Sequence, residues 1–340
     1  MAIGRPRITL TRLGTILVVL ATVARIAATY DVFSETTDEP MHVSSGLQIY
    51  EQHRYDVQTA SPPLPRLFIA AGPWLLGVRL PRRMPVPGMM KMFYTGGKYP
   101  ASLITARAGT LVFVIVALGA AWAWARREAG ELAAFLTVLL LAGEPLFLAH
   151  GGLATHDAAA AAGTAVSLLA FSRWLERPGP RNAALLGVAY GFAVLCKFSC
   201  IVFVPVASAA ILLVRRQRPS LRAVATTPAI VCGVSALVIW AGYGFSVGTV
   251  LPMGFVHEII GQSALLSWRI PAPRFVDGIA MVRHFDRNGT LSYFHGHISS
   301  GGWWYYFPAA VALKTTLPLL ALAIAGLFVA RRTPAMQGLA

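Results

Sequence analysis

The feature that most constrains this 340-residue chain is a succession of apolar runs. Each run is near or above the length of about 18 residues that marks a membrane-spanning helix. The hydrocarbon core of a bilayer offers no water to backbone N–H and C=O groups, so such runs must form helices. Strand alternation is absent from the sequence, which argues against a membrane barrel. The chain is 56% hydrophobic and only 13% charged, and we therefore expect an all-α, polytopic membrane protein.

Eight apolar runs predict transmembrane helices, and the arginines beside them predict their orientation. The expected helices cover residues 10–31, 104–125, 131–150, 158–174, 182–197, 198–214, 222–245 and 304–330. With eight crossings, five basic clusters fall on one side: Arg5/Arg7/Arg12, Arg126/Arg127, Arg173/Arg177/Arg181, Arg215/Arg216/Arg218/Arg222 and Arg331/Arg332. Basic residues mark the cytoplasmic side, which predicts a cytoplasmic N-terminus. Residues 182–214 allow either two short helices or one re-entrant pair, because each half is barely long enough to span.

The positions of these arginine clusters explain the formal net charge of +15 by membrane topology. Such a charge is also typical of nucleic-acid-binding proteins, but here the arginines flank apolar runs and do not form a basic groove. The first run follows basic residues and allows a cleaved signal peptide. We expect an uncleaved helix instead, because the run extends to about Tyr30 without a small-residue cleavage site.

Two long segments lie outside the cytoplasm in this topology, residues 32–103 and residues 246–303. Both are rich in proline, glycine and aromatic residues and need packing of their own. We expect short helices in them that lie along the membrane surface. The sequence shows no internal repeat, so residues 1–340 are expected to form a single membrane domain.

Neither the cysteines nor the histidines predict a metal site or a disulfide framework. Cys196, Cys200 and Cys232 lie in apolar runs and are expected to be buried thiols. His295 and His297 offer two potential ligands, but a complete site needs further ligands that the sequence does not place.

Ionisable residues gather at one expected depth, the outer membrane interface. They are Asp38, Glu39, His42, Arg66, Arg107, Asp157, Lys197 and Lys314. Ionisable groups within or beside membrane helices are costly and mark functional sites. Their convergence predicts a site where a lipid-borne anion meets a polar substrate, whereas a transporter would place such groups near the midplane.

The carboxylates of this set leave two interpretations open. Asp38 and Glu39 either serve a proton transfer or belong to a solvated turn before Pro40. Asp157 opens an expected helix, where a carboxylate caps the N-terminus and interacts favourably with the helix dipole. Capping does not exclude a functional role.

The basic residues of this set likewise allow either an anion-binding or a purely structural interpretation. Lys197 lies between two apolar half-helices and is expected to bind an anion, unless it snorkels from a tight outer turn. Lys314 lies deeper in the last apolar run, and snorkelling explains it equally. Arg107 is either an ordinary interfacial arginine or a phosphate ligand. Arg66 follows a rigid proline-rich turn, which makes a phosphate contact a hypothesis only.

Four stretches of the chain carry a resemblance to a known family. They are Asp38-Glu39 leading into Gly46, Tyr50 and Tyr55-Asp56; Ser61-Pro62-Pro63-Leu64-Pro65-Arg66; Asp157 with Lys197; and Gly302-Trp303-Trp304-Tyr305-Tyr306-Phe307-Pro308 with Lys314-Thr315-Thr316-Leu317-Pro318. Through them the chain resembles the polyprenyl-phosphate-sugar-dependent glycosyltransferases of the GT-C class. It is most similar to the protein O-mannosyltransferases and the bacterial lipid A aminoarabinose transferases.

The resemblance implies site residues, with some departures. The acidic pair Asp38-Glu39 corresponds to one implicated in catalysis in the family. The second stretch is similar to the mannosyltransferase motif His-Pro-Pro-Leu-Gly-Lys, with Ser61 and Arg66 in place of His and Lys. The aminoarabinose transferases carry a phosphate-binding lysine before the two prolines, so Arg66 is expected to supply that charge here. The supporting site residues are expected to be His42, Asp56, Asp157, Trp303, Trp304 and Lys314.

The implied reaction moves a mannose-like or aminoarabinose-like sugar, with inversion, from a polyprenyl phosphate to a hydroxyl of a protein or glycolipid. Asp38 or Glu39 is expected to be the base, and Arg66, Arg107 and Lys197 are expected to neutralise the phosphate. This chemistry requires no divalent metal or other cofactor, and no nucleic acid is expected as a partner. We expect the site on the periplasmic face of a bacterial plasma membrane.

Two other functions remain open at this point. A transporter or flippase for polyprenyl-phosphate-linked lipids would share the topology and the phosphate contacts, yet would change no bond. Enzymes of the class usually continue beyond the helix that is last here, which also allows a non-catalytic remnant.

Overall fold

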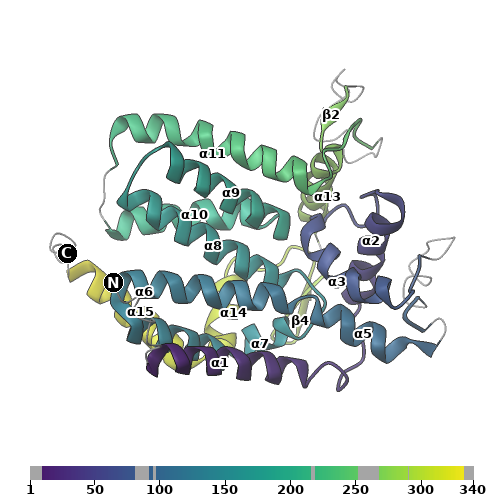
Figure 1. The fold of residues 1–340 in the computed structure, drawn as a ribbon, viewed down its shortest axis with the longest axis horizontal. Helices are drawn as coiled ribbons and strands as arrows, with labels where there is room; N and C mark the ends of the chain where they lie inside the picture. The colour runs from purple at the N-terminus through teal and green to yellow at the C-terminus, as the bar shows by residue number, and fades with distance from the viewer. Residues whose placement is uncertain are drawn as a thin grey trace, which may run out of the picture.

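The computed structural model describes residues 10–80, 92–94, 97–215, 219–251, 268–289 and 291–332. It is mostly helical, at 74%, with little strand. The predicted all-α membrane fold is therefore confirmed. Most long helices run side by side in one direction, with their ends at two opposite sides of the molecule (Figure 1).

The bundle is built from the apolar runs of the sequence. Its helices are α1 (Leu10–Ala27), α6 (Leu111–Gly143), α7 (Pro145–Gly151), α8 (Asp157–Glu176), α9 (Pro180–Cys196), α10 (Cys200–Arg215), α11 (Leu221–Gly242) and α15 (Leu317–Arg332). Hydrogen bonds join neighbouring helices in the core: Ser167 in α8 donates to the Ala189 carbonyl of α9 at 2.9 Å, and Ser235 in α11 donates to the Gly187 carbonyl at 2.9 Å. Hydroxyl groups are typical of membrane helix interfaces because they find carbonyl partners there.

By length and composition, four helices of the described chain can cross a membrane. They cover Leu10–Ala27, Tyr99–Gly143, Asp157–Glu176 and Leu221–Gly242, with α5 (Tyr99–Ala108) leading into α6. A fifth is present if α14 (Tyr306–Lys314) and α15 form one broken span. Gly130, at φ 85° and ψ −174°, interrupts α6 between the two predicted helices at 104–125 and 131–150. The predicted total of eight crossings stays a prediction.

The last apolar run differs from the sequence prediction. We expected one helix over residues 304–330, but the chain bends by 116° between α14 and α15. Pro318 has no backbone N–H, and its ring would collide with the carbonyl of Lys314 if the helix continued. The helix therefore ends at Lys314, and Thr316 binds Glu144 instead, with 2.8 Å between Thr316 Oγ1 and Glu144 Oε2.

Residues 182–214 form two separate helices, one of the alternatives that the sequence left open. α9 ends at Cys196 and α10 begins at Cys200, with Lys197-Phe198-Ser199 between them. The two helices lie against each other, because the Tyr190 hydroxyl donates to the Ile201 carbonyl at 3.0 Å. Lys197 therefore lies at the tip of a helical hairpin.

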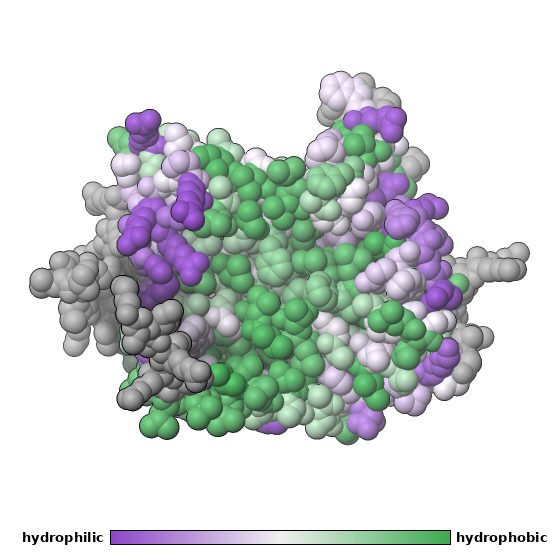
Figure 2. Space-filling model, in the orientation of Figure 1, coloured by the Kyte–Doolittle hydropathy of each residue, from purple (hydrophilic) through white to green (hydrophobic). Residues whose placement is uncertain are grey.

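One end of the bundle carries the predicted basic clusters. Arg12 and Arg126 both pair with Glu131, at 2.7 Å and 2.6 Å, and Arg127 pairs with Glu176. These pairs join α1, α6 and α8 at the same end, as the charge pattern predicts. Figure 2 shows a broad apolar band between this hydrophilic end and the opposite one. Arg5, Arg7, Arg216 and Arg218 lie outside the described residues.

The helices in the described parts of the two predicted loops lie at the other end of the bundle (Figure 1). The first contains α2 (Asp38–Gln52) and α3 (Pro63–Leu75), and the second contains α13 (Pro273–Asn288). Short helices in these loops are thus confirmed. Two antiparallel strand pairs were not predicted: β1 (Val247–Gly248) with β2 (Ile270–Pro271), and β3 (Ser292–Phe294) with β4 (His297–Ser299).

Helix α2 packs against α3 at Gly46. A Cβ atom at this position would lie 2.2 Å from the Arg66 carbonyl oxygen and 2.4 Å from Ala70 Cβ. The backbones of the two helices therefore approach as closely as only glycine permits. This contact holds α2, which carries Asp38 and His42, in place.

We expect Gly46→Ala to lower the free energy of unfolding by at least about 1–3 kcal/mol, because an added methyl group overpacks this contact. Gly119→Ala in α6 is the matched control, since a Cβ there meets nothing within 4 Å. Thermal unfolding of the two purified variants in the same detergent tests the expectation. Equal stability of both variants would show that α2 and α3 adjust freely.

Candidate active site

A carboxylate and a lysine meet at the loop end of the bundle. Lys197 Nζ donates to Asp157 Oδ1 at 2.6 Å, and His150 Nδ1 lies 3.4 Å from the other oxygen, Oδ2. Asp157 is the first residue of α8, and Lys197 lies in the break between α9 and α10. The side chains of Asp157 and Lys197 are 38% and 41% exposed. Asp157 and Lys197, which the sequence placed at the same interface, therefore form an ion pair, and both side chains remain accessible to a ligand.

Two histidines connect this pair to α2. The rings of His42 and His156 contact each other edge to face, with 3.9 Å between their centroids. His42 Nδ1 lies 3.1 Å from Gln58 Oε1, an acceptor, so Nδ1 carries the proton. Burial lowers the pKa of His42 to about 4, and burial also holds the pKa of His156 well below its ordinary value. Both rings are therefore neutral at pH 7, and they link α2 to the residue that precedes Asp157.

Asp38 lies on the accessible side of α2. It is exposed and is the first residue of the helix, and it makes no hydrogen bond or ion pair with the described part of the chain. His42 follows four residues later, so the two side chains share one face of the helix. Asp38 is thus a free carboxylate on the face that leads to His42 and His156.

Glu39, its neighbour in sequence, is fully buried. Its Oε1 accepts from Arg107 Nε at 2.8 Å and from the Ala154 N–H at 2.9 Å. Its Oε2 accepts from Arg107 Nη2 at 2.9 Å and from the Thr36 N–H at 2.8 Å. Burial raises the pKa of Glu39, but the hydrogen bonds from Arg107, Ala154 and Thr36 outweigh it and leave the pKa below its ordinary value. Glu39 is an anion whose oxygens are occupied by the protein itself.

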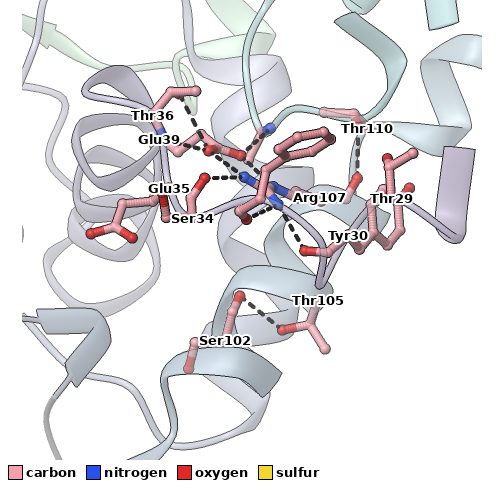
Figure 3. Close-up of polar contacts among 12 residues, drawn as sticks. Thr29, Tyr30, Ser34, Glu35, Thr36, Glu39, Ser102, Thr105, Arg107 and Thr110 are labelled. Carbon is pink, nitrogen blue, oxygen red and sulfur yellow. Dashed lines mark hydrogen bonds and ion pairs between the residues drawn. The ribbon is translucent and has the colours of Figure 1, made fainter. Parts of the chain in front are cut away.

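The guanidinium group of Arg107 is likewise fully hydrogen-bonded within the protein (Figure 3). Besides the two bonds to Glu39, it donates to the carbonyls of Tyr30, Phe33 and Ser34 at 2.7–2.9 Å. All five guanidinium N–H groups therefore have acceptors in the chain. The side chain is 1% exposed, so it has neither a free donor nor a path to a phosphate group. It fixes residues 30–34 and the start of α2.

Arg66 has a comparable place in the loop between α2 and α3. It is 1% exposed and donates to the carbonyls of Pro62, Val57 and Gln58 at 3.1, 2.9 and 2.9 Å. Burial lowers the pKa of Arg66 to about 10, which leaves it cationic at pH 7. It clamps the loop whose Gln58 side chain binds His42.

The other predicted supporting residues lie apart from this cluster. Asp56 pairs with Arg54 and with Arg274, at 2.6 Å from Arg274 Nε, and so joins the first loop to α13. These contacts are structural. No sequence signal paired Asp56 with a residue in the distant second loop.

The aromatic stretch and Lys314 also lie apart. Trp303 packs on Phe294 with 5.7 Å between ring centroids, and Trp304 is 90% exposed. Lys314 is exposed at the end of α14. In the part of the chain that the structure describes, none of them bonds to the Asp157–Lys197 pair. His295 and His297 lie at the β3–β4 hairpin, and the described residues hold no group of three or more potential metal ligands.

Sequence reasoning missed Glu144. It is 7% exposed and lines a cavity of about 270 Å³ together with His150 and Asp157. Its position inside the predicted helix 131–150 was an available signal, because a carboxylate in an apolar run marks a functional site.

Comparison with known proteins agrees with the resemblance. Residues 100–243 match the family model described as dolichyl-phosphate-mannose-protein mannosyltransferase, and Arg107, Asp157 and Lys197 lie within the match. No curated protein and no solved structure matches the chain. The family match, together with the apolar helices, supports a multi-pass membrane glycosyltransferase of the GT-C kind. Residues 100–243 are thus the part of the chain that is similar to the dolichyl-phosphate-mannose-protein mannosyltransferase family.

Proposed function

We propose that this protein transfers a sugar from a polyprenyl-phosphate donor to a hydroxyl group of an extracytoplasmic protein or glycolipid, with inversion at the anomeric carbon. The observation that carries the proposal is the accessible Lys197–Asp157 pair beside the helix that presents Asp38. This cluster lies at the bundle end opposite the arginine clusters. Because basic residues mark the cytoplasmic side, this end is proposed to face away from the cytoplasm, into the periplasm of a bacterium.

Lys197 is the proposed phosphate ligand. Asp157 accepts one of its hydrogen bonds, and an ammonium group has three N–H donors, so two remain for phosphate oxygens. The side chain is 41% exposed, unlike those of Arg66 and Arg107. A cation at this position stabilises the negative charge that develops on the leaving phosphate.

Asp38 is the proposed base. Its carboxylate takes the proton of the acceptor hydroxyl as that oxygen attacks the anomeric carbon. The bond between the anomeric carbon and the phosphate oxygen breaks, and polyprenyl phosphate leaves with the electron pair. One displacement inverts the anomeric centre. Since phosphate is a good leaving group, the step balances without a separate general acid.

Glu39, Arg107 and Arg66 act as positioning residues in this proposal. The Glu39–Arg107 pair holds the first turn of α2 against the segment before α8, through the Ala154 N–H. Asp38 lies in that first turn. Arg66 fixes the loop that orients His42 through Gln58. Trp304 and Lys314, both exposed, are proposed to contact the lipid chain of the donor.

The direct test is a transfer assay with purified protein in lipid vesicles. Polyprenyl-phosphate-mannose and polyprenyl-phosphate-aminoarabinose, each labelled in the sugar, are supplied with membrane extract as the source of acceptors. Appearance of label on a protein or glycolipid supports the proposal. Bound donor that crosses the bilayer without release of polyprenyl phosphate would establish a flippase instead.

In this assay we expect Lys197→Ala to raise the apparent KM for the donor about 10- to 100-fold, since a charge-assisted hydrogen bond contributes about 1.5–3 kcal/mol. The KM for the acceptor is expected to stay unchanged. Lys98→Ala is the matched control, because Lys98 donates only to the Leu76 carbonyl among the described residues. An unchanged donor KM in Lys197→Ala would remove this lysine from the phosphate site.

A further inference from the structure

A cavity of about 270 Å³ lies between α7, the start of α8 and the start of α15. Its polar lining consists of Glu144, His150, Asp157 and Thr315, and its apolar lining of Leu146, Phe147, Ala158, Ala161 and Leu319. The volume is just below the range of roughly 300–1,000 Å³ typical of small-molecule sites. It suits one small polar ring with an apolar face and is too small for an oligosaccharide.

Glu144 brings an unsatisfied group to this cavity. The residue is 7% exposed, and its Oε2 accepts from the Thr316 hydroxyl at 2.8 Å. Among the described residues, its buried Oε1 has no hydrogen-bond partner, and no cation lies within ion-pair distance of the carboxylate. A buried carboxylate oxygen without a donor costs free energy. Glu144 therefore brings a carboxylate oxygen that lacks a donor to the wall of this cavity.

Asp157 connects the cavity to the proposed phosphate site. One of its oxygens accepts from Lys197, and the other lies 3.4 Å from His150, which also lines the cavity. A donor whose phosphate contacts Lys197 thus has its sugar within reach of the cavity. The two parts of the ligand are adjacent, as in any sugar phosphate.

We infer that this cavity is the subsite for the transferred sugar and that Glu144 determines specificity by accepting a hydrogen bond from a hydroxyl or ammonium group on that sugar. The inference rests on the proposed function and deepens it. An ionised carboxylate is an acceptor only, so either group satisfies Oε1. An ammonium group would also neutralise its charge.

The experiment measures kcat and KM for the two labelled donors with wild type, Glu144→Gln and Glu144→Leu. Leu removes the acceptor, and we expect kcat/KM to fall about 10- to 100-fold, the effect of one lost charge-assisted hydrogen bond. Gln keeps a carbonyl acceptor and removes the charge. A hydroxyl contact therefore predicts a mild effect of Gln with both donors. An ammonium contact predicts a clearly larger effect of Gln with the aminoarabinose donor than with the mannose donor, because the charge interaction is lost.

Thr316→Val is the control for a structural role, because it removes the hydroxyl that binds Glu144 Oε2 but leaves Oε1 in place. We expect it to lower the donor kcat/KM less than Glu144→Leu does, because the carboxylate that accepts from the sugar is still present. Thermal unfolding of each variant is measured in parallel.

Three results would overturn the inference. If wild type transfers sugar and both Glu144 variants equal it, the subsite is wrong while the proposed function stands. If Thr316→Val loses as much activity and thermal stability as the Glu144 variants, Glu144 serves only to hold α15. If wild type transfers neither sugar, the proposed function fails and the subsite fails with it.

Discussion

Asp38→Asn is expected to lower kcat by about 10²–10⁴-fold, the usual contribution of a general base. Asparagine has nearly the same shape but cannot take the proton of the acceptor hydroxyl. Because Asp38 is exposed and has no partner in the described chain, its replacement removes no structural contact. The donor KM and the thermal unfolding temperature are therefore expected to stay at their wild-type values. The transfer assay at saturating donor measures the effect.

Asp31→Asn is the matched control. Asp31 is also exposed and precedes the same helix in the chain, but it lies outside α2. We expect this variant to keep full activity. Full activity of Asp38→Asn as well would exclude Asp38 as the base. A comparable loss in both variants would point to the charge of the whole loop as the important quantity.

Arg107→Ala is expected to lower the free energy of unfolding by about 3–5 kcal/mol, because it leaves the Glu39 carboxylate buried without its partner. Three backbone carbonyls, those of Tyr30, Phe33 and Ser34, lose their donor at the same time. We expect activity to be lost together with the fold of the first loop. Thermal unfolding and limited proteolysis of the purified protein measure this.

The Glu39→Gln change in the Arg107→Ala background tests the cause. It removes the unpaired charge, so the double variant is expected to be more stable than Arg107→Ala alone. Arg54→Ala is the surface control, since the Arg54 side chain is 64% exposed and its ion pair contributes little. Normal stability of Arg107→Ala with a raised donor KM would instead restore the phosphate contact that the sequence predicted.

The sequence by itself determined the membrane fold and the two ends of the bundle. Long apolar runs form helices in a bilayer, because every backbone N–H then finds a hydrogen-bond partner within its own segment. The basic residues at the ends of these runs then group together, and the Arg12–Glu131 and Arg127–Glu176 pairs show this directly. The convergence of Asp157 and Lys197 at one end of the bundle was also predicted, since both lie at helix ends on the same side, whereas their ion pair is seen only in the structure.

Only the tertiary structure decided the roles of individual side chains within the site. Asp38 and Glu39 are adjacent in sequence, but successive side chains on a helix point about 100° apart, so one is exposed while the other is buried against Arg107. The sequence shows that Arg66 and Arg107 are charged. It does not show that backbone carbonyls accept the hydrogen bonds of their guanidinium groups. Glu144 and Thr316 are 172 residues apart, and only the packing of α15 near α7 brings Thr316 against the Glu144 carboxylate at the wall of the cavity. A sequence therefore shows which groups are available, and the folded chain decides which of them are left free to bind a ligand.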